Sequence, residues 1–430
     1  MERGVDRPPP PPPRPFSVAP FRCIKEGIGM IEVTESSYCI YNCTVITPRG
    51  PLGGRVLVEE GMIVAVEENP APPRGEEGYG GRLVDAGGGY LCPGFVEAHI
   101  HGCGPAGAEE VLLGKSNVLE VMAATLSRFG INTFVPTFPF HMEVMIRLAE
   151  ELGRKPGLAG RIPGLYLEGP FVNPGKRGGI PSEFLRGPDK AYLEDIINAS
   201  GDRILMMTVA PELEGARDVA ARLLAEGIVL CLGHSAASAG EALAFLESLR
   251  STGAPPGRMN ITHLFNAMSP LSHKTPGLAA LPFLDDDIYF ELNGDGIHVA
   301  DEILKVCARH LNRERMILVS DAVVSAGEPY GEGEYFGRSI RSGPDGVRYT
   351  GDGTLIGSNR LIHQAARHYR YVSGLAFEEV IPLITGNPLR LFGFPGRGRI
   401  ETGAPADLVV ANADYEVLIN LNPFRADTGL

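Results

Sequence analysis

The chain has 430 residues, of which 44% are hydrophobic, and this suffices for one large core and a smaller module. Its net charge of −13 argues against binding to nucleic acid or to an anionic membrane surface. No apolar run approaches the ~20 residues that cross a bilayer, the first residues lack the apolar region of a secretory signal, and the seven cysteines form no disulfide framework. We therefore expect a cytoplasmic protein with reduced thiols.

Prolines dominate residues 1–29, which show no hydrophobic periodicity, so this extension is predicted to be disordered. Short β-rich runs follow from residue 38 to residue 92, and the EEGM turn between two of them predicts a hairpin. The C-terminal segment RGRIETGAPADLVVANADYEVL has the same character. We therefore expect residues 30–92 and 389–430 to pair into one small β domain.

Eight apolar runs alternate with helical patterns between these two β segments, over residues 93–388. Regular alternation of strand and helix predicts parallel strands with helices outside, and a count of eight favours a closed barrel of the (β/α)8 TIM type. The expected strands are 94–100, 131–137, 162–168, 204–209, 228–232, 259–264, 287–292 and 316–320. The expected helices are 107–129, 141–153, 214–226, 236–249, 300–311 and 359–372.

Residue types that bind metals recur where these strands are expected to end. A barrel gathers the C-terminal ends of its strands around one pocket, where enzymes with this fold carry their chemistry. His99 and His101 end GFVEAHIH, and residues two apart on a strand point to the same face, so both rings can reach one ion. A pair of surface or core histidines is the alternative interpretation of these two residues.

Three further residues of this kind are Glu168 in YLEGPF, His234 in LGHS and His263 in THLFNAM. Glu168 alone is equally typical of an exposed loop, but a metal would remove the cost of burying its charge. One Glu and two His leave a catalytic ion an open position for water, whose pKa such an ion lowers to about 7.

Two residues are candidates for proton transfer and substrate binding. Asp321, in LVSDA, ends the last strand and can carry a proton from water to a leaving group, although a helix N-cap is equally typical of such an Asp. His298 follows an Asn-Gly-Asp-Gly turn at the same mouth, where it can contact a substrate oxygen or a phosphate. The pattern as a whole predicts a metal-dependent hydrolase.

Seven segments, taken in order, closely resemble the N-acetylglucosamine-6-phosphate deacetylases of the amidohydrolase superfamily: PGFVEAHIHG, LEGPFVNPGKRGG, LGHSAAS, THLFNAMSPLSHKTPG, NGDGIHV, LVSDA and DGTLIGS. The resemblance covers about residues 38–412, and LEGPF, THLFNAM and DGIHV are its most specific parts. It implies an α/β fold in which a (β/α)8 barrel carries a small β-sandwich built from both chain ends. It also implies hydrolysis of N-acetylglucosamine 6-phosphate to glucosamine 6-phosphate and acetate.

The resemblance also assigns roles to individual residues. It makes Glu168, His234 and His263 the ligands of a catalytic zinc or iron ion, and Asp321 the catalytic acid and base. His99 and His101 match a second-metal site that only some members retain. The implied substrate contacts are Asn266, Ala267, His298, Leu355, Ile356, Gly357 and Ser358. The family is usually dimeric, so a homodimer or higher oligomer is expected, with Lys274 reaching the substrate phosphate of the neighbouring subunit.

Two positions depart from the family pattern. Ile180 stands where the family commonly has a His that polarises the substrate carbonyl, so the metal alone, a second ion or a shifted substrate must account for the difference. Lys274 replaces an Arg and lacks its bidentate fork. These departures leave open a deacylase for another N-acyl compound. A non-catalytic assembly protein is the remaining alternative, although such proteins usually lose the metal ligands that this chain retains.

Overall fold

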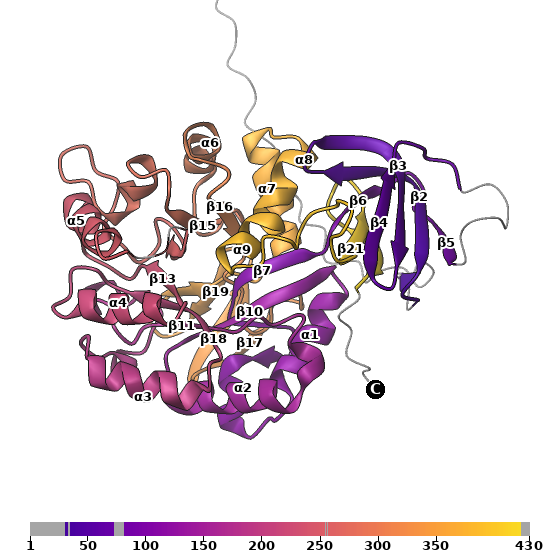
Figure 1. Ribbon diagram of the computed structural model, residues 1–430. Helices are drawn as coiled ribbons and strands as arrows, with labels where there is room; N and C mark the ends of the chain where they lie inside the picture. The colour runs from indigo at the N-terminus through magenta and orange to yellow at the C-terminus, as the bar shows by residue number, and fades with distance from the viewer. Residues whose placement is uncertain (1–30, 33–34, 73–80, 254, 256, 423–430) are drawn as a thin grey trace, which may run out of the picture.

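The computed structural model describes residues 31–32, 35–72, 81–253, 255 and 257–422. The Pro-rich extension predicted to be disordered lies outside these residues. Eight parallel strands form one sheet that curves into a barrel, which confirms the predicted fold class (Figure 1). In chain order these strands are β7 (Phe95–Ile100), β10 (Ile131–Pro139), β11 (Leu165–Glu168), β12 (Ile204–Val209), β13 (Val229–Leu232), β14 (Met259–Ile261), β15 (Tyr289–Asn293) and β16 (Met316–Val319).

The barrel closes by a short contact between the end of its first strand, β7, and the residues that follow its last strand, β16. The Asp321 N–H donates to the carbonyl oxygen of His99 at 3.1 Å, and Ile100 forms an isolated parallel bridge with Ala322. The eight-stranded sheet has β16 and β7 at its two edges, so this contact is the seam of the barrel. The seam therefore lies directly beside His99, His101 and Asp321.

Helices cover the outside of the barrel (Figure 1). They are α1 (Val118–Ser127), α2 (Met142–Arg154), α3 (Lys190–Ser200), α4 (Ala216–Ala225), α5 (Ala239–Arg250), α6 (Asp301–His310) and α7 (Ile362–Ser373), followed by the short α8 (Phe377–Val380) and α9 (Gly386–Leu391). The long apolar core lies between these helices and the strands, and a separate buried cluster that includes Tyr166, Cys231 and Tyr289 fills the barrel interior.

Two helical predictions need correction. The single helix expected over 107–129 is wrong, because the chain forms a 3-10 helix at Ala108–Leu113 and then α1. Gly114 separates the two with a φ of 83°, the left-handed conformation that ends helices and suits glycine. Helix α3 has no predicted counterpart. Its N-cap is Asp189, whose carboxylate accepts the N–H groups of Ala191 and Tyr192.

The two ends of the chain meet in a second sheet, drawn to the right of the barrel in Figure 1. Its strands are β1 (Ile31–Glu32), β2 (Tyr38–Thr47), β3 (Gly50–Glu59), β4 (Met62–Glu67), β5 (Arg82–Asp85), β6 (Tyr90–Pro93), β21 (Leu408–Ala411) and β22 (Val417–Leu421). The pairing of β21 with β6 is antiparallel and joins the C-terminal segment to the N-terminal one. The predicted hairpin is β3–β4, which turns at Glu60 and Gly61. The domain boundaries remain a prediction.

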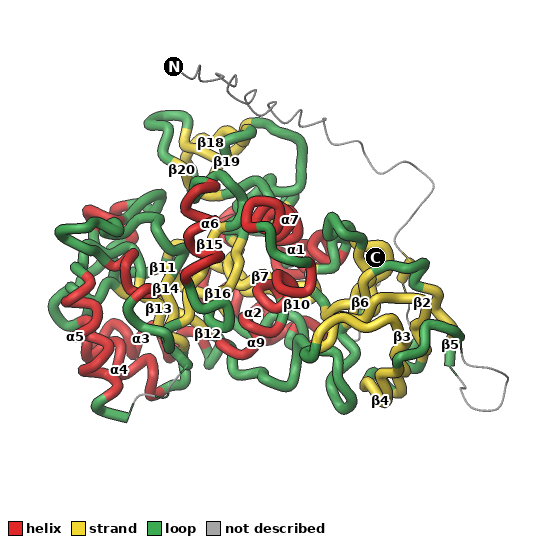
Figure 2. Tube along the Cα trace, turned by 90° about the horizontal axis from the view of Figure 1, so that it is seen from above, coloured by secondary structure: helices red, strands yellow, loops and turns green. Residues whose placement is uncertain are grey.

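A third sheet, which the sequence did not predict, lies between β16 and α7. It is antiparallel and consists of β17 (Glu332–Tyr335), β18 (Arg338–Gly343), β19 (Gly346–Tyr349) and β20 (Leu355–Gly357). Figure 2 shows this inserted sheet apart from the sheet of the chain ends. Among the described residues, none of the helices is long and apolar enough to cross a membrane.

Candidate active site

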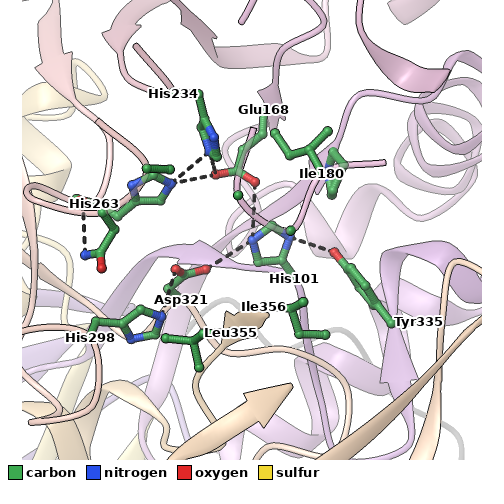
Figure 3. Close-up of a pocket in the computed structure, with 15 residues that line it drawn as sticks. His101, Glu168, Ile180, His234, His263, His298, Asp321, Tyr335, Leu355 and Ile356 are labelled. Carbon is green, nitrogen blue, oxygen red and sulfur yellow. Dashed lines mark hydrogen bonds and ion pairs between the residues drawn. The ribbon is translucent and has the colours of Figure 1, made fainter. Parts of the chain in front are cut away.

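A cavity of about 230 Å³ lies at the C-terminal end of the barrel strands (Figure 3). Most of the site residues predicted from the sequence line this cavity. The predicted residues that line it are His101, Glu168, His234, His263, Asn266, Ala267, His298, Asp321, Leu355 and Ile356. His99 lies just behind His101 and is fully buried. Long-range folding, and no local motif, therefore builds this site.

The first cluster of potential ligands consists of Glu168, His234 and His263. Glu168 is the last residue of β11, and the two histidines follow β13 and β14 by two residues. The Nε2 atoms of His234 and His263 are 3.0 Å apart and lie 3.4 Å and 3.2 Å from Oε1 of Glu168. All three side chains are buried and their donor atoms lie within 4.8 Å of one another.

The chemistry of this first cluster suits a cation. Nδ1 of His234 lies 2.9 Å from the carbonyl oxygen of Lys176, which can only accept, so Nδ1 carries the proton and the lone pair of Nε2 points into the cluster. Burial acts to raise the pKa of Glu168, but contacts with His234, His263 and His101 hold it well below its ordinary value. The Glu168 carboxylate and the His234 imidazole thus direct electron pairs at one point, which Nε2 of His263 also faces, and this donor set suits a divalent metal.

The second cluster consists of His99, His101 and Asp321. The Nε2 atoms of the two histidines are 3.3 Å apart, and Oδ1 of Asp321 lies 3.2 Å from Nε2 of His101 and 3.5 Å from that of His99. Nδ1 of His99 contacts the carboxylate of Glu291 at 2.9 Å. Glu168 lies between the clusters, because its oxygens also approach His99 at 3.4 Å and His101 at 3.6 Å.

Asp321 also contacts His298 on the side away from the second cluster. Nε2 of His298 is 3.4 Å from Oδ2 of Asp321, and its Nδ1 is 2.9 Å from Oδ2 of the buried Asp295. Burial acts to lower the pKa of His298, but the charge and hydrogen bond of Asp295 raise it above its ordinary value. Burial acts to raise the pKa of Asp321, but His99, His101 and His298 hold it below its ordinary value. Asp321 is therefore an ionised carboxylate.

The backbone is strained at three of these residues. His234, His263 and Asp321 have φ values of 46°, 27° and 52°, in the left-handed region that residues other than glycine seldom adopt. Such strain persists only where the surrounding structure enforces it, and it concentrates at functional sites. These three side chains therefore point into the cavity at a cost to the fold, which supports a functional role for them.

Three residues that the resemblance nominated as substrate contacts lie elsewhere. Gly357 and Ser358 are outside the cavity lining and support Asp321 through its backbone. The Ser358 N–H donates to the Asp321 carbonyl oxygen at 2.8 Å, and a Cβ on Gly357 would lie 2.6 Å from that oxygen. Lys274 is exposed and is also outside the lining of its own chain's cavity.

Several residues of the site were not predicted from the sequence. Tyr335, Pro139, Gly178 and Gly179 line the cavity together with the buried Ile180. Glu291 is fully buried against both clusters, where it also accepts the backbone N–H of His263 at 3.0 Å. A Glu inside the apolar run IYFELN was the signal for it, because an unpaired buried charge is costly.

Comparisons with known proteins agree with this geometry. No protein-family model matches the chain. The chain is 30% identical over 348 residues to the N-acetylglucosamine-6-phosphate deacetylase of Danio rerio, which covers 78% of this chain and 83% of that protein. It is 27% identical over 381 residues to the N-acetylgalactosamine-6-phosphate deacetylase of Escherichia coli O157:H7, with 87% and 94% covered.

The structural comparison gives the same result. A mutant of the N-acetyl-D-glucosamine-6-phosphate deacetylase from Mycobacterium smegmatis, solved in complex with N-acetyl-D-glucosamine-6-phosphate, superposes with a TM-score of 0.79 at 28% identity. The match covers 91% of this chain and 99% of that one.

Proposed function

We propose that this chain, which belongs to the N-acetylglucosamine-6-phosphate deacetylase family, hydrolyses the N-acetyl group of N-acetylglucosamine 6-phosphate to give acetate and glucosamine 6-phosphate. The observation that carries the proposal is the convergence of Glu168, His234 and His263 beside an ionised Asp321 in one cavity. A non-catalytic assembly protein would have no reason to keep these strained, buried and polar side chains together.

Glu168, His234 and His263 would hold one divalent ion, zinc or iron, and His99 and His101 with Asp321 would hold a second. Such an ion supplies Lewis-acid activation of a water molecule and of the acetamide carbonyl. Glu168 would be available to either site, because its oxygens approach histidines of both clusters. The fit rests on the donor set and on its burial.

Asp321 carries the proton transfer. Its carboxylate removes a proton from the attacking water as the new bond to the carbonyl carbon forms. It then gives this proton to the sugar nitrogen as the carbon–nitrogen bond breaks, so that a neutral amine leaves. His298, held by Asp295, fixes the orientation of the Asp321 carboxylate from the side away from the metal ligands.

The phosphate of the substrate needs a positive group from outside the cavity. Among the described residues, no Lys or Arg lines the cavity of the chain. Lys274 is exposed, and we assign it to the phosphate bound in a neighbouring subunit of a homodimer. The walls that contact the sugar are the backbone and side chains of Asn266 and Ala267 and the pair Leu355 and Ile356, all of which line the cavity.

The sugar substrate has alternatives to N-acetylglucosamine 6-phosphate. The Escherichia coli relative, named for N-acetylgalactosamine 6-phosphate, aligns over 87% of this chain, so that epimer is the second candidate substrate. Ile180, in the cavity wall, keeps another N-acyl amino sugar as a further alternative. Acetate release should be measured from both N-acetylhexosamine 6-phosphates and from the two unphosphorylated sugars, with metal analysis of the same preparation. Equal rates on phosphorylated and unphosphorylated sugars would refute the phosphate requirement. A protein that contains no metal, and whose activity does not increase when metal is added, would refute the proposed metal-dependent hydrolysis.

A further inference from the structure

Tyr335 connects the inserted sheet to the second ligand cluster. It is the last residue of β17, immediately before a hairpin turn in which Phe336 and Gly337 have φ values of 46° and 72°. Its side chain is buried in a small apolar cluster with Val323, Ile340, Val347 and Tyr349. The ring packs edge-on against Phe336 at a centroid distance of 4.9 Å. The position of the phenol oxygen is therefore fixed by packing.

The Tyr335 hydroxyl lies 3.2 Å from Nδ1 of His101 (Figure 3). Nε2 of the same ring faces Asp321 at 3.2 Å and the second cluster. A histidine that binds a metal through Nε2 must keep a lone pair there, so its proton is on Nδ1. Nδ1–H then donates to the hydroxyl oxygen of Tyr335, which is the hydrogen-bond partner that the structure gives this nitrogen.

Two of the other three candidate ligand histidines have stronger acceptors behind them, whereas Nδ1 of His263 is buried without a hydrogen-bond partner among the described residues. His99 has the carboxylate of Glu291 at 2.9 Å, and His234 has the carbonyl oxygen of Lys176 at 2.9 Å. Such partners fix the tautomer and the orientation of a ligand histidine, and losing one costs about 10–100-fold in metal affinity. A phenol hydroxyl is neutral near pH 7, so that of Tyr335 is a weaker acceptor than the Glu291 carboxylate.

We propose that Tyr335 is a positioning residue for the second metal site, where it fixes the tautomer of His101 and so sets the affinity of that site for its ion. The inference rests on the proposed function, because it requires the second ion. Tyr335 acts through His101, and the inserted sheet that carries it thereby controls whether one chain holds one ion or two.

The test is a Zn²⁺ titration of chelator-treated protein, wild type against Tyr335→Phe, by calorimetry with a competing chelator. Phenylalanine keeps the ring packing and removes only the hydroxyl. We expect the second Zn²⁺ to bind about 10–100-fold more weakly while the first binds within twofold of wild type. Tyr349→Phe is the matched control, because it removes a buried hydroxyl of the same sheet that donates to the Gly179 carbonyl oxygen at 3.1 Å. It should leave both affinities unchanged.

Each other outcome has a distinct meaning. An unchanged second affinity in Tyr335→Phe overturns the inference, as does an equal loss at both sites or an equal loss in Tyr349→Phe, which would show general loosening of the sheet. Wild-type protein that binds one Zn²⁺ with the primary ligands also overturns it but leaves the proposed hydrolase intact. Wild-type protein that binds no Zn²⁺, and gains no activity with iron, refutes the proposed function itself.

Discussion

The two ligand clusters at the barrel mouth use the same residue types but are built in different ways. Glu168, His234 and His263 come from β11, β13 and β14, strands that lie within the continuous part of the sheet. His99, His101 and Asp321 come from β7 and from the residue pair after β16, on the two sides of the barrel seam. The first cluster therefore lies over continuously paired strands, whereas the second also depends on how the seam is held.

The residues that contact the seam come from the inserted sheet and from the segment that follows it, which are not part of the alternating strands and helices of the barrel. The backbone of Ser358, which follows β20 of the inserted sheet, donates to Asp321, and Tyr335 of β17 supports His101. A cluster that depends on an insertion can change without loss of the barrel.

The largest effect is expected when the first cluster is broken. His234→Ala removes one of three ligands of the primary ion and leaves the second cluster in place, because His234 contacts Glu168 and His263 only among the potential ligands. We expect acetate release to fall below detection and metal content to fall by one ion per chain. Turnover assays and metal analysis check this. An active His234→Ala variant would reverse the ranking of the two clusters.

The next effect concerns the residue that the second cluster shares with catalysis. Asp321→Asn keeps the shape of the side chain but removes the group that accepts and returns the proton. We expect kcat to fall about 10²–10⁴-fold. The primary ion should remain bound, because Asp321 belongs to the other cluster. Metal analysis alongside kcat separates the two roles, and near-normal turnover would exclude Asp321 as the acid and base.

A smaller effect is expected when only the second cluster is broken. His99→Ala should lower metal content from two ions to one, with the primary ion retained and more activity left than in His234→Ala. The two variants form a matched pair, because each removes one buried imidazole from one cluster. Unchanged metal content in His99→Ala would show that the His99–His101 pair binds no ion.

The fold and the first cluster could be predicted because both follow from strand periodicity. Each apolar run marked a strand, and Glu168 stood at the end of one, where a barrel places its chemistry. The inserted sheet escaped prediction because β17, EGEY, has three exposed residues and no apolar alternation. Tyr335, the last residue of β17, was not predicted for the same reason. The left-handed φ of Asp321 and the support from Ser358 arise from long-range contacts that no local pattern encodes.

The last prediction tests the residue that joins the two clusters. The Glu291 carboxylate accepts from three donors, namely Nδ1–H of His99 at 2.9 Å, the His263 N–H at 3.0 Å and the Asn260 side-chain amide at 2.8 Å. In Glu291→Gln the new amide group faces either the Asn260 amide, which removes one hydrogen bond, or the His99 and His263 donors, which removes two, in a fully buried place. Urea unfolding should show a loss of about 1–3 kcal/mol.

The same Glu291→Gln variant should also bind its second Zn²⁺ about tenfold more weakly, because a neutral amide orients the His99 ring less firmly than the Glu291 carboxylate does. Glu97→Gln is the control, since Glu97 is equally buried but bonds to the backbone N–H of His99 and to Ser320, and makes no hydrogen bond to the His99 ring among the described residues. It should cost stability without this selective loss of the second ion. Glu291→Gln could instead weaken binding of the first Zn²⁺ most, through the backbone of His263. That result would contradict the conclusion that the second cluster depends more on residues outside the cluster than the first does.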